Sequence, residues 1–157
     1  MEIKTYFGEY DNEIISLILS IQNDENKLGL SLQEQQDLLN IHGSYQAKGG
    51  EFWIAFSQGK VIGTIGLIMK ANHCAVLKKF FVDAAVRSHG VGAALYQKLL
   101  AFAKNAGIEH IILDTPSIAH AAHRFYEHAG FYQIQTEQLP VPYTYPDRDC
   151  ILYMLDL

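Results

Sequence analysis

The sequence has few cysteines, a small share of charged residues and no long hydrophobic run. Two cysteines, Cys74 and Cys150, are too few for a disulfide framework, so a reduced pair in a cytoplasmic protein is expected. Charged residues make up 18% of the chain and aromatic residues 11%, which excludes a disordered segment. No apolar run approaches the roughly 18 residues of a membrane span. The N-terminus lacks the basic and apolar stretches of a signal peptide.

Net charge and length narrow the class of protein further. A formal net charge of −5 argues against a phosphate backbone as the main partner, so neither nucleic acid nor a membrane is expected as a partner. A chain of 157 residues can bury about two-thirds of its unfolded surface, which is enough for one self-sufficient core. No repeat or linker interrupts the chain. Residues 1–157 are therefore expected to form a single domain.

The hydrophobic pattern predicts an α+β domain. Short β-rich runs predict strands at residues 3–7, 52–56, 61–69, 75–82, 111–113, 131–135 and 150–155. Helical spacing predicts helices over about 11–21, 31–43, 91–106 and 116–129. Asp11 or Asn12 is expected to cap the first helix, Ser31 and Glu34 form a capping box for the second, and Pro116 and Ser117 open the last.

Two details of the predicted strands concern side-chain placement. Gly63 and Gly66 inside residues 61–69 indicate a bulge or a close approach of neighbouring atoms. In residues 75–82, alternation places Lys78 and Lys79 on opposite faces of the sheet, so no single basic patch is expected there.

The most informative stretch joins the strand that ends at Val82 to the longest predicted helix. Gly90 and Gly92 let a ligand approach the backbone, and the following helix offers unpaired N–H groups and a positive dipole end. This combination predicts an anion site, most naturally for phosphate. A Walker loop is excluded because no Gly-Lys-Ser/Thr ending is present. A dinucleotide fingerprint gains support from Asp114 at the end of the next strand, but it fits poorly because its third glycine falls on Leu95. An ordinary glycine-rich turn is the plain alternative.

Two motifs resemble those of the GNAT acyltransferases. Arg87-Ser88-His89-Gly90-Val91-Gly92 matches the Arg/Gln-x-x-Gly-x-Gly/Ala pattern, and the run from Ala122 through Tyr126 to Gly130-Phe131 resembles the family's second hallmark. The resemblance covers most of the chain. It implies a mixed, mostly antiparallel sheet of about seven strands flanked by about four helices, with the fourth and fifth strands splayed apart. It also implies N-acetyl transfer from acetyl-coenzyme A, without a metal, to a primary amine of a small molecule or a peptide.

The resemblance assigns roles to individual residues. The backbone of Phe80, Phe81 and Val82 would hold the pantetheine arm, and the N–H group of Val82 would polarise the thioester carbonyl. The pyrophosphate would lie on the loop and first helical turn that comprise Arg87, Ser88, His89, Gly90, Val91, Gly92 and Ala93. The hydroxyl of Tyr126 would return a proton to the departing thiolate; a merely packed aromatic ring is the alternative. Ala119 departs from the pattern, because many relatives carry an asparagine there that contacts the cofactor, and His120 or Ser117 would have to replace it.

The acceptor amine needs a base, because an alkylammonium with a pKa of about 10.4 is almost never neutral at pH 7. The sequence offers four candidates, or water relayed by one of them: His73, Asp83, His89 and Glu127. His120, His123 and Glu127 also share one helical face, but their spacing is not a recognised metal pattern, and a solvated face is the better interpretation.

The last loop is expected to border the acceptor pocket through Tyr143, Tyr145, Asp147 and Asp149. Aromatic rings and carboxylates suit a cationic amine, whereas a well-packed turn is the alternative. Neither motif contains a cysteine, so direct attack in a ternary complex is expected. A non-catalytic acyl-coenzyme A-binding module is the rival function. A homodimer, common in such a family, is consistent with the sequence.

Overall fold

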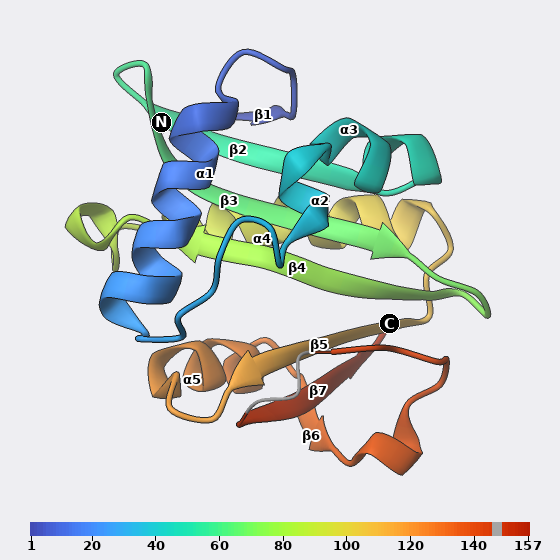
Figure 1. Cartoon of the computed structure of the whole chain (residues 1–157). Helices are drawn as coiled ribbons and strands as arrows, with labels where there is room; N and C mark the ends of the chain where they lie inside the picture. The colour runs from blue at the N-terminus through green and yellow to red at the C-terminus, as the bar shows by residue number, and fades with distance from the viewer. Residues whose placement is uncertain (146–148) are drawn as a thin grey trace.

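A seven-stranded mixed sheet runs through the computed structural model, which describes residues 1–145 and 149–157. Its strand order is β1-β2-β3-β4-β5-β7-β6, and all neighbours are antiparallel except β4 and β5 (Figure 1). The strands are β1 (Glu2–Thr5), β2 (Glu51–Ser57), β3 (Lys60–Met69), β4 (Cys74–Val82), β5 (His110–Pro116), β6 (Tyr132–Ile134) and β7 (Cys150–Asp156). The predicted α+β fold with a mostly antiparallel sheet is confirmed.

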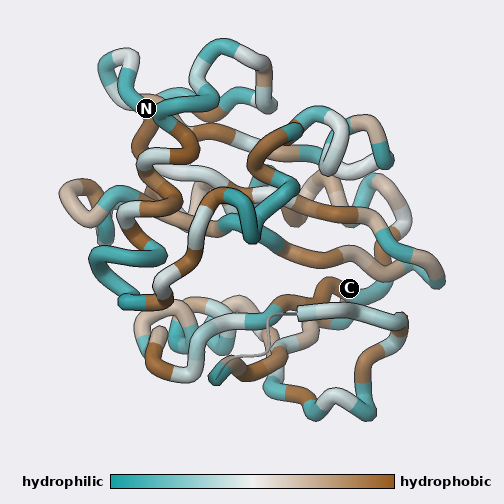
Figure 2. The backbone as a smooth tube through the Cα atoms, viewed as in Figure 1, coloured by the Kyte–Doolittle hydropathy of each residue, from teal (hydrophilic) through white to brown (hydrophobic). Residues whose placement is uncertain are grey.

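Helices cover both faces of this sheet (Figure 1). One face carries α1 (Asp11–Leu19), its π-helical continuation η1 (Ser20–Glu25), α2 (Gln36–Leu39) and α3 (Ile41–Ser44); the other carries α4 (Val91–Asn105) and α5 (His120–His128). The tube in Figure 2 is hydrophobic along the central strands, where the two cores meet the sheet. Ile14 and Ile18 are fully buried on the α1–α3 face, as are Leu95 and Leu99 on the α4–α5 face. Each such side chain contributes about 1.5–3 kcal/mol through burial.

One predicted helix cap and two predicted helix starts are wrong, although α1 does begin at Asp11 as predicted. Asp11 does not cap α1, because its carboxylate accepts a hydrogen bond of 2.6 Å from the Tyr6 hydroxyl instead. Ser31 and Glu34 do form the reciprocal bonds of a capping box, but around a turn, since α2 begins only at Gln36. The last helix begins at His120, because Pro116 is still paired with Cys150 as the final residue of β5.

The sheet opens between β4 and β5. The two strands pair only at Cys74 with His110, Ala75 with Ile111, and Val76 with Ile112, and diverge beyond that point. The predicted splay between the fourth and fifth strands is thus confirmed. A strand edge that loses its partner exposes backbone N–H and C=O groups, so the remainder of β4 faces an open space on this side.

A β-bulge interrupts β4 opposite Thr64 and Gly66 of β3. Lys79 is the extra residue: its φ is 53°, and its carbonyl accepts a bond of 2.7 Å from the Thr64 hydroxyl. An extra residue breaks side-chain alternation, so the predicted separation of Lys78 and Lys79 is wrong. The Lys78 ammonium lies 5.9 Å from the centre of the Tyr143 ring and that of Lys79 pairs with Asp37 of α2, both on the α1–α3 face.

The glycines of β3 are explained by this bulge and by close packing. A Cβ atom on Gly66 would lie 2.6 Å from Cε1 of Tyr45, whose ring is fully buried against Phe52. The prediction of a bulge or close approach at this strand is therefore confirmed.

Candidate functional site

A cavity of about 960 Å³ opens where β4 and β5 diverge. Its wall includes β4 from Leu77 to Val82, the loop before α4, the end of β5 and the start of α5, and it extends to η1 and α2. Most small-molecule and cofactor sites are concave spaces of about 300–1,000 Å³. The cavity is thus large enough for an extended cofactor together with a second ligand.

One part of the wall is the N-terminus of α4. Gly90 is its N-cap with a φ of 85°, a conformation that favours glycine, and no side chain caps the helix. Ser88, Gly90, Gly92 and Ala93 line the cavity. The first-turn N–H groups and the dipole of this 15-residue helix are the features by which helix N-termini bind anions.

The other predicted loop residues lie around this helix N-terminus. Val91 is buried in the core, and the exposed His89 ring places Nδ1 2.8 Å from the Arg87 carbonyl oxygen. Arg87 lines the cavity, where its Nε donates to the Val82 carbonyl at 3.0 Å and its two terminal nitrogens lie 2.5 and 3.0 Å from the carboxylate of Glu25. The loop is therefore joined to the end of η1.

The unpaired edge of β4 forms a second part of the wall. Phe80, Phe81 and Val82 all line the cavity. The Asp83 N–H donates to the Ile62 carbonyl at 2.8 Å, so alternation along the strand turns the Val82 N–H away from β3. A backbone donor at Val82 therefore points to the side from which β5 has diverged.

Tyr126 of α5 lies in the same cavity. Its side chain is 6% exposed, and its ring packs 6.3 Å from that of Phe80 and 5.5 Å from that of Phe131. Burial, with a further contribution from the charge of Asp114, raises the pKa of the Tyr126 hydroxyl well above its ordinary value. The hydroxyl therefore keeps its proton at any physiological pH.

The four residues predicted as candidate bases have other surroundings. Asp83 accepts a bond from the Ala85 N–H at 3.0 Å, Glu127 accepts one from the Tyr153 hydroxyl at 2.7 Å, and His73 and His89 are exposed. In the described part of the chain, none of the four lines the cavity.

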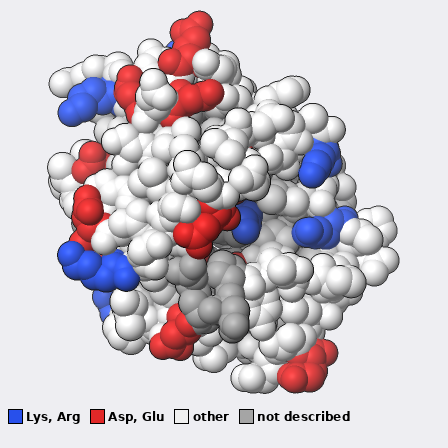
Figure 3. Space-filling view, viewed as in Figure 1, with Lys and Arg blue, Asp and Glu red and all other residues white. Residues whose placement is uncertain are grey.

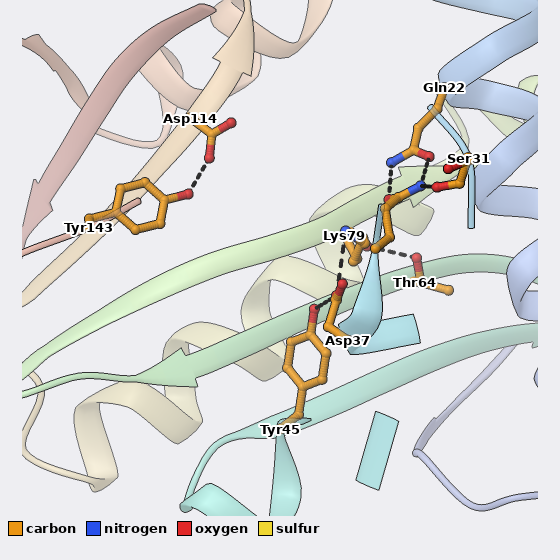
Figure 4. Close-up of polar contacts among 9 residues, drawn as sticks. Gln22, Ser31, Asp37, Tyr45, Thr64, Lys79, Asp114 and Tyr143 are labelled. Atoms are coloured by element: carbon orange, nitrogen blue, oxygen red, sulfur yellow. Dashed lines mark hydrogen bonds and ion pairs between the residues drawn. The ribbon is translucent and has the colours of Figure 1, made fainter. Parts of the chain in front are cut away.

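Asp114, near the end of β5, is a carboxylate that lines the cavity. It was not among the candidate bases predicted from the sequence. It accepts a hydrogen bond from the hydroxyl of Tyr143, as Figure 4 shows. Burial lowers the pKa of the Lys79 ammonium, and the charges of Asp37 and Asp114 oppose that shift. The available signal was one charged residue directly after the apolar run Ile111-Ile112-Leu113. Asp37 and Glu34 also line the cavity.

The predicted acceptor-loop residues divide into separate groups. Tyr143 reaches Asp114, and Tyr145 lies beside it with a ring separation of 5.7 Å and a hydroxyl 2.7 Å from that of Thr136. Burial, followed by the charge of Asp114 and the hydrogen bond to it, raises the pKa of Tyr143 above its ordinary value. Asp149 is exposed and does not line the described cavity wall, and Asp147 lies outside the described residues.

The remaining predictions concern the position of Ala119, the histidines of α5 and the absence of a metal ion or a membrane span. Ala119 and His120 line the cavity, and so does Cys150, whereas Ser117 is absent from the described wall. His123 places Nε2 2.9 Å from the Pro116 carbonyl oxygen. Within residues 1–145 and 149–157, no three His, Cys, Asp or Glu side chains gather closely enough to hold a metal ion, and no helix is long and apolar enough to span a membrane.

Comparison with known proteins identifies the family. A profile of the acetyltransferase (GNAT) family matches residues 17–131. An acetyltransferase structure from Streptococcus agalactiae 2603 is 39% identical with a TM-score of 0.96, covering 99% of this chain and 98% of that one. A streptothricin acetyltransferase structure from Bacillus anthracis, described as putative and solved with acetyl coenzyme A, is 27% identical with a TM-score of 0.60 over 74% of this chain and 68% of that one.

Curated relatives are longer than this chain. The probable N-acetyltransferase camello of Xenopus tropicalis is 33% identical over 109 residues, which are 68% of this chain and 50% of that protein. The chain spans about half the length of the curated relatives it matches. The family profile covers well over half of the chain, and its fold and both motifs agree with it. The chain belongs to the GNAT acetyltransferase family.

Proposed function

We propose that this chain is an N-acetyltransferase that moves an acetyl group from acetyl-coenzyme A to a primary amine by direct attack in a ternary complex. The observation that carries this proposal is one continuous cavity in which the uncapped α4 N-terminus, the unpaired edge of β4 and the Tyr126 side chain meet. The matched structure solved with acetyl coenzyme A supports the choice of cosubstrate.

The cosubstrate would extend along this wall. Backbone N–H groups from Ser88 to Ala93 bind the pyrophosphate, and the helix dipole adds attraction for its charge. The edge of β4 holds the pantetheine arm through backbone bonds, and the Val82 N–H donates to the thioester oxygen, on which negative charge develops during attack. A net charge of −5 does not oppose this binding, because backbone dipoles supply the contacts.

Asp114 and Tyr126 would carry the proton transfers, so the reaction requires no metal. Asp114 binds the acceptor ammonium and takes its first proton; the nitrogen lone pair then forms the C–N bond as the C–S bond breaks, and the electron pair passes to sulfur. Tyr126 donates a proton to this thiolate and regains one from the nitrogen. Burial is the larger cause of the raised pKa of Tyr126 and the charge of Asp114 the smaller, so protonation of Asp114 removes the smaller part of the shift before the thiolate forms.

Substitution of Tyr126 by phenylalanine tests this function. We expect coenzyme A affinity by calorimetry to stay at the wild-type value, while thiol release with an amine panel falls about 10²- to 10⁴-fold. Unchanged turnover would remove the catalytic role of Tyr126. A wild-type chain that binds acetyl-coenzyme A but acetylates no amine would instead support the binding-module alternative.

A variant of Cys150 tests direct attack, because the fold brings this thiol to the cavity although neither motif contains a cysteine. The expected result for Cys150→Ala is unchanged turnover, with no acetylated protein in the mass spectrum of wild type mixed with acetyl-coenzyme A alone. A stoichiometric acetyl adduct that disappears in Cys150→Ala would establish an acyl-enzyme route instead.

A further inference from the structure

Charged side chains of both signs line the part of the cavity on the α1–α3 face of the sheet. We call this part the charged end; it is lined by Gln22, Gln35, Asp37, Lys78, Lys79 and Asp114. Figure 3 shows acidic and basic side chains side by side in the middle of this face of the molecule. The two lysines and two aspartates among these six residues carry no net formal charge. Glu34 also lines the cavity, but it is exposed and accepts a hydrogen bond from the Ser31 hydroxyl.

The Lys79 side chain is mostly buried, yet its pairing within the protein is loose. Its side chain is 10% exposed, and its ammonium lies 3.4 Å from Oδ2 of Asp37. That distance exceeds the roughly 2.7–2.9 Å of a charge-assisted hydrogen bond. The same oxygen accepts a hydrogen bond of 2.6 Å from the Tyr45 hydroxyl (Figure 4). The Lys79 ammonium thus retains donor capacity inside the cavity.

The β-bulge explains why a lysine occupies this place. Without the extra residue, alternation would turn Lys79 towards the α4–α5 face, where Phe80 packs against Tyr126. The bulge places Lys79 beside Lys78 on the α1–α3 face, where both lysines line the same cavity as Asp114 and Tyr126. A ligand ammonium at Asp114 therefore lies in the cavity that these groups share.

We propose that the acceptor is a small amino acid, whose carboxylate binds the ammonium of Lys79 while its amino group binds Asp114. This proposal rests on the proposed function and names the acceptor class of the same site. A zwitterion adds no net charge to a charged end that is already neutral, whereas a diamine brings two cations towards two lysines. The neighbouring amides of Gln22 and Gln35 bond to each other at 2.8 and 2.9 Å, which holds the adjoining wall in place.

Matched acceptors that differ only in the carboxylate test the proposal. Thiol release is measured with alanine, leucine, phenylalanine and aspartate, with their α-carboxamides, and with 1,4-diaminobutane. Loss of one charge-assisted contact predicts that wild type prefers each acid over its amide by about 10- to 100-fold in kcat/KM. Lys79→Met is expected to abolish this preference by slowing the acids alone, and Lys79→Arg to retain part of it.

The Asp37→Asn variant distinguishes two roles of Lys79: binding of the acceptor carboxylate, and a structural ion pair with Asp37. If Lys79 only anchors α2 to β4, Lys79→Met and Asp37→Asn remove the same pair and act alike on every acceptor. If Lys79 binds the carboxylate, Asp37→Asn frees the ammonium and raises the preference for acids. A wild type that uses amides or the diamine at least as well as acids, or a Lys79→Met variant that slows acids and amides equally, overturns the proposal.

A binding measurement keeps this test distinct from that of the proposed function. The coenzyme A-saturated protein is titrated with leucine and with leucinamide in a calorimeter. If no acceptor is acetylated, the proposed function fails, while tighter binding of leucine that is lost in Lys79→Met still supports the acceptor class. Equal binding of the two ligands, or binding of neither, overturns it.

Discussion

Arg87 and Glu25 form a two-point ion pair that joins the loop before α4 to the end of η1, across 62 positions of sequence, at N···O distances of 2.5 and 3.0 Å. Both side chains are partly exposed, at 43% and 35%. The Arg87 guanidinium, which the family motif assigns to anion binding, is therefore already paired with the Glu25 carboxylate. A bound pyrophosphate and Glu25 would compete for it.

Removal of Glu25 is expected to tighten coenzyme A binding. An exposed ion pair is worth about 0.2–1 kcal/mol, so Glu25→Gln should lower the Kd about 1.4- to fivefold in calorimetry at low salt. Arg87→Gln should raise the Kd, and the double variant should match Arg87→Gln alone. Weaker binding in Glu25→Gln would mean that the pair holds the loop in shape and does not compete with the ligand.

Asp114→Asn is expected to lower kcat about 10²- to 10⁴-fold, because an amide cannot take the ammonium proton. The variant keeps an oxygen that accepts from Tyr143 and leaves the α4 end of the cavity intact, so coenzyme A affinity should not change. Tyr143→Phe serves as the comparison: it removes the hydrogen bond to Asp114 but not the base, so its loss in kcat should be smaller. Equal kcat in Asp114→Asn and wild type would exclude Asp114 as the base.

Two glycine variants separate ligand binding from packing. Gly90→Ala forces a side chain into a φ of 85°, at a cost of about 1–2 kcal/mol, and places a methyl group beside the anion site. Gly66→Ala drives its Cβ against the Tyr45 ring, at about 1–3 kcal/mol. Urea unfolding should show both to be destabilised, and calorimetry should show weaker coenzyme A binding only for Gly90→Ala. Wild-type affinity in Gly90→Ala would contradict the anion site at this helix.

Stability is expected to fall at alkaline pH through Tyr153. Burial, its hydrogen bond to Glu127 and the charge of that carboxylate raise the pKa of Tyr153 to about 12. Since the unfolded value is about 10, the unfolded chain loses this proton first. The contribution is fully present below about pH 10 and is lost as pH rises towards 12.

Urea unfolding at steps of pH measures this effect. Tyr6, bonded to Asp11, also has a pKa raised to about 12, so Tyr153→Phe should reduce the alkaline slope of the free energy of unfolding and Tyr6→Phe/Tyr153→Phe should reduce it further. An equal slope in wild type and Tyr153→Phe would show that the Tyr153 hydroxyl has the same pKa in the folded and the unfolded chain.

Several features of the fold followed from local patterns in the chain. The helix over 91–106 and the central strands were predicted closely, because their apolar residues recur at the periods of the elements that bury them. The glycine loop before α4 was also located correctly, since a positive φ at Gly90 depends on that residue's own backbone freedom. The start of the last helix was predicted less well, because Pro116 pairs with Cys150, which is distant in the sequence.

The charged end of the cavity depended on contacts that no local pattern encodes. The bulge at Lys79 exists only in the pairing of β4 with β3, and it reverses the side on which the lysine lies. Asp114 meets Tyr143 across 29 positions, and Lys79 meets Asp37 across two layers of the fold. The periodicity of the sequence shows on which face of its own helix or strand a residue lies. Which charges face one another is decided by register, bulges and packing between elements. For that reason the glycine loop before α4 could be predicted from the sequence, and the charged end of the cavity could not.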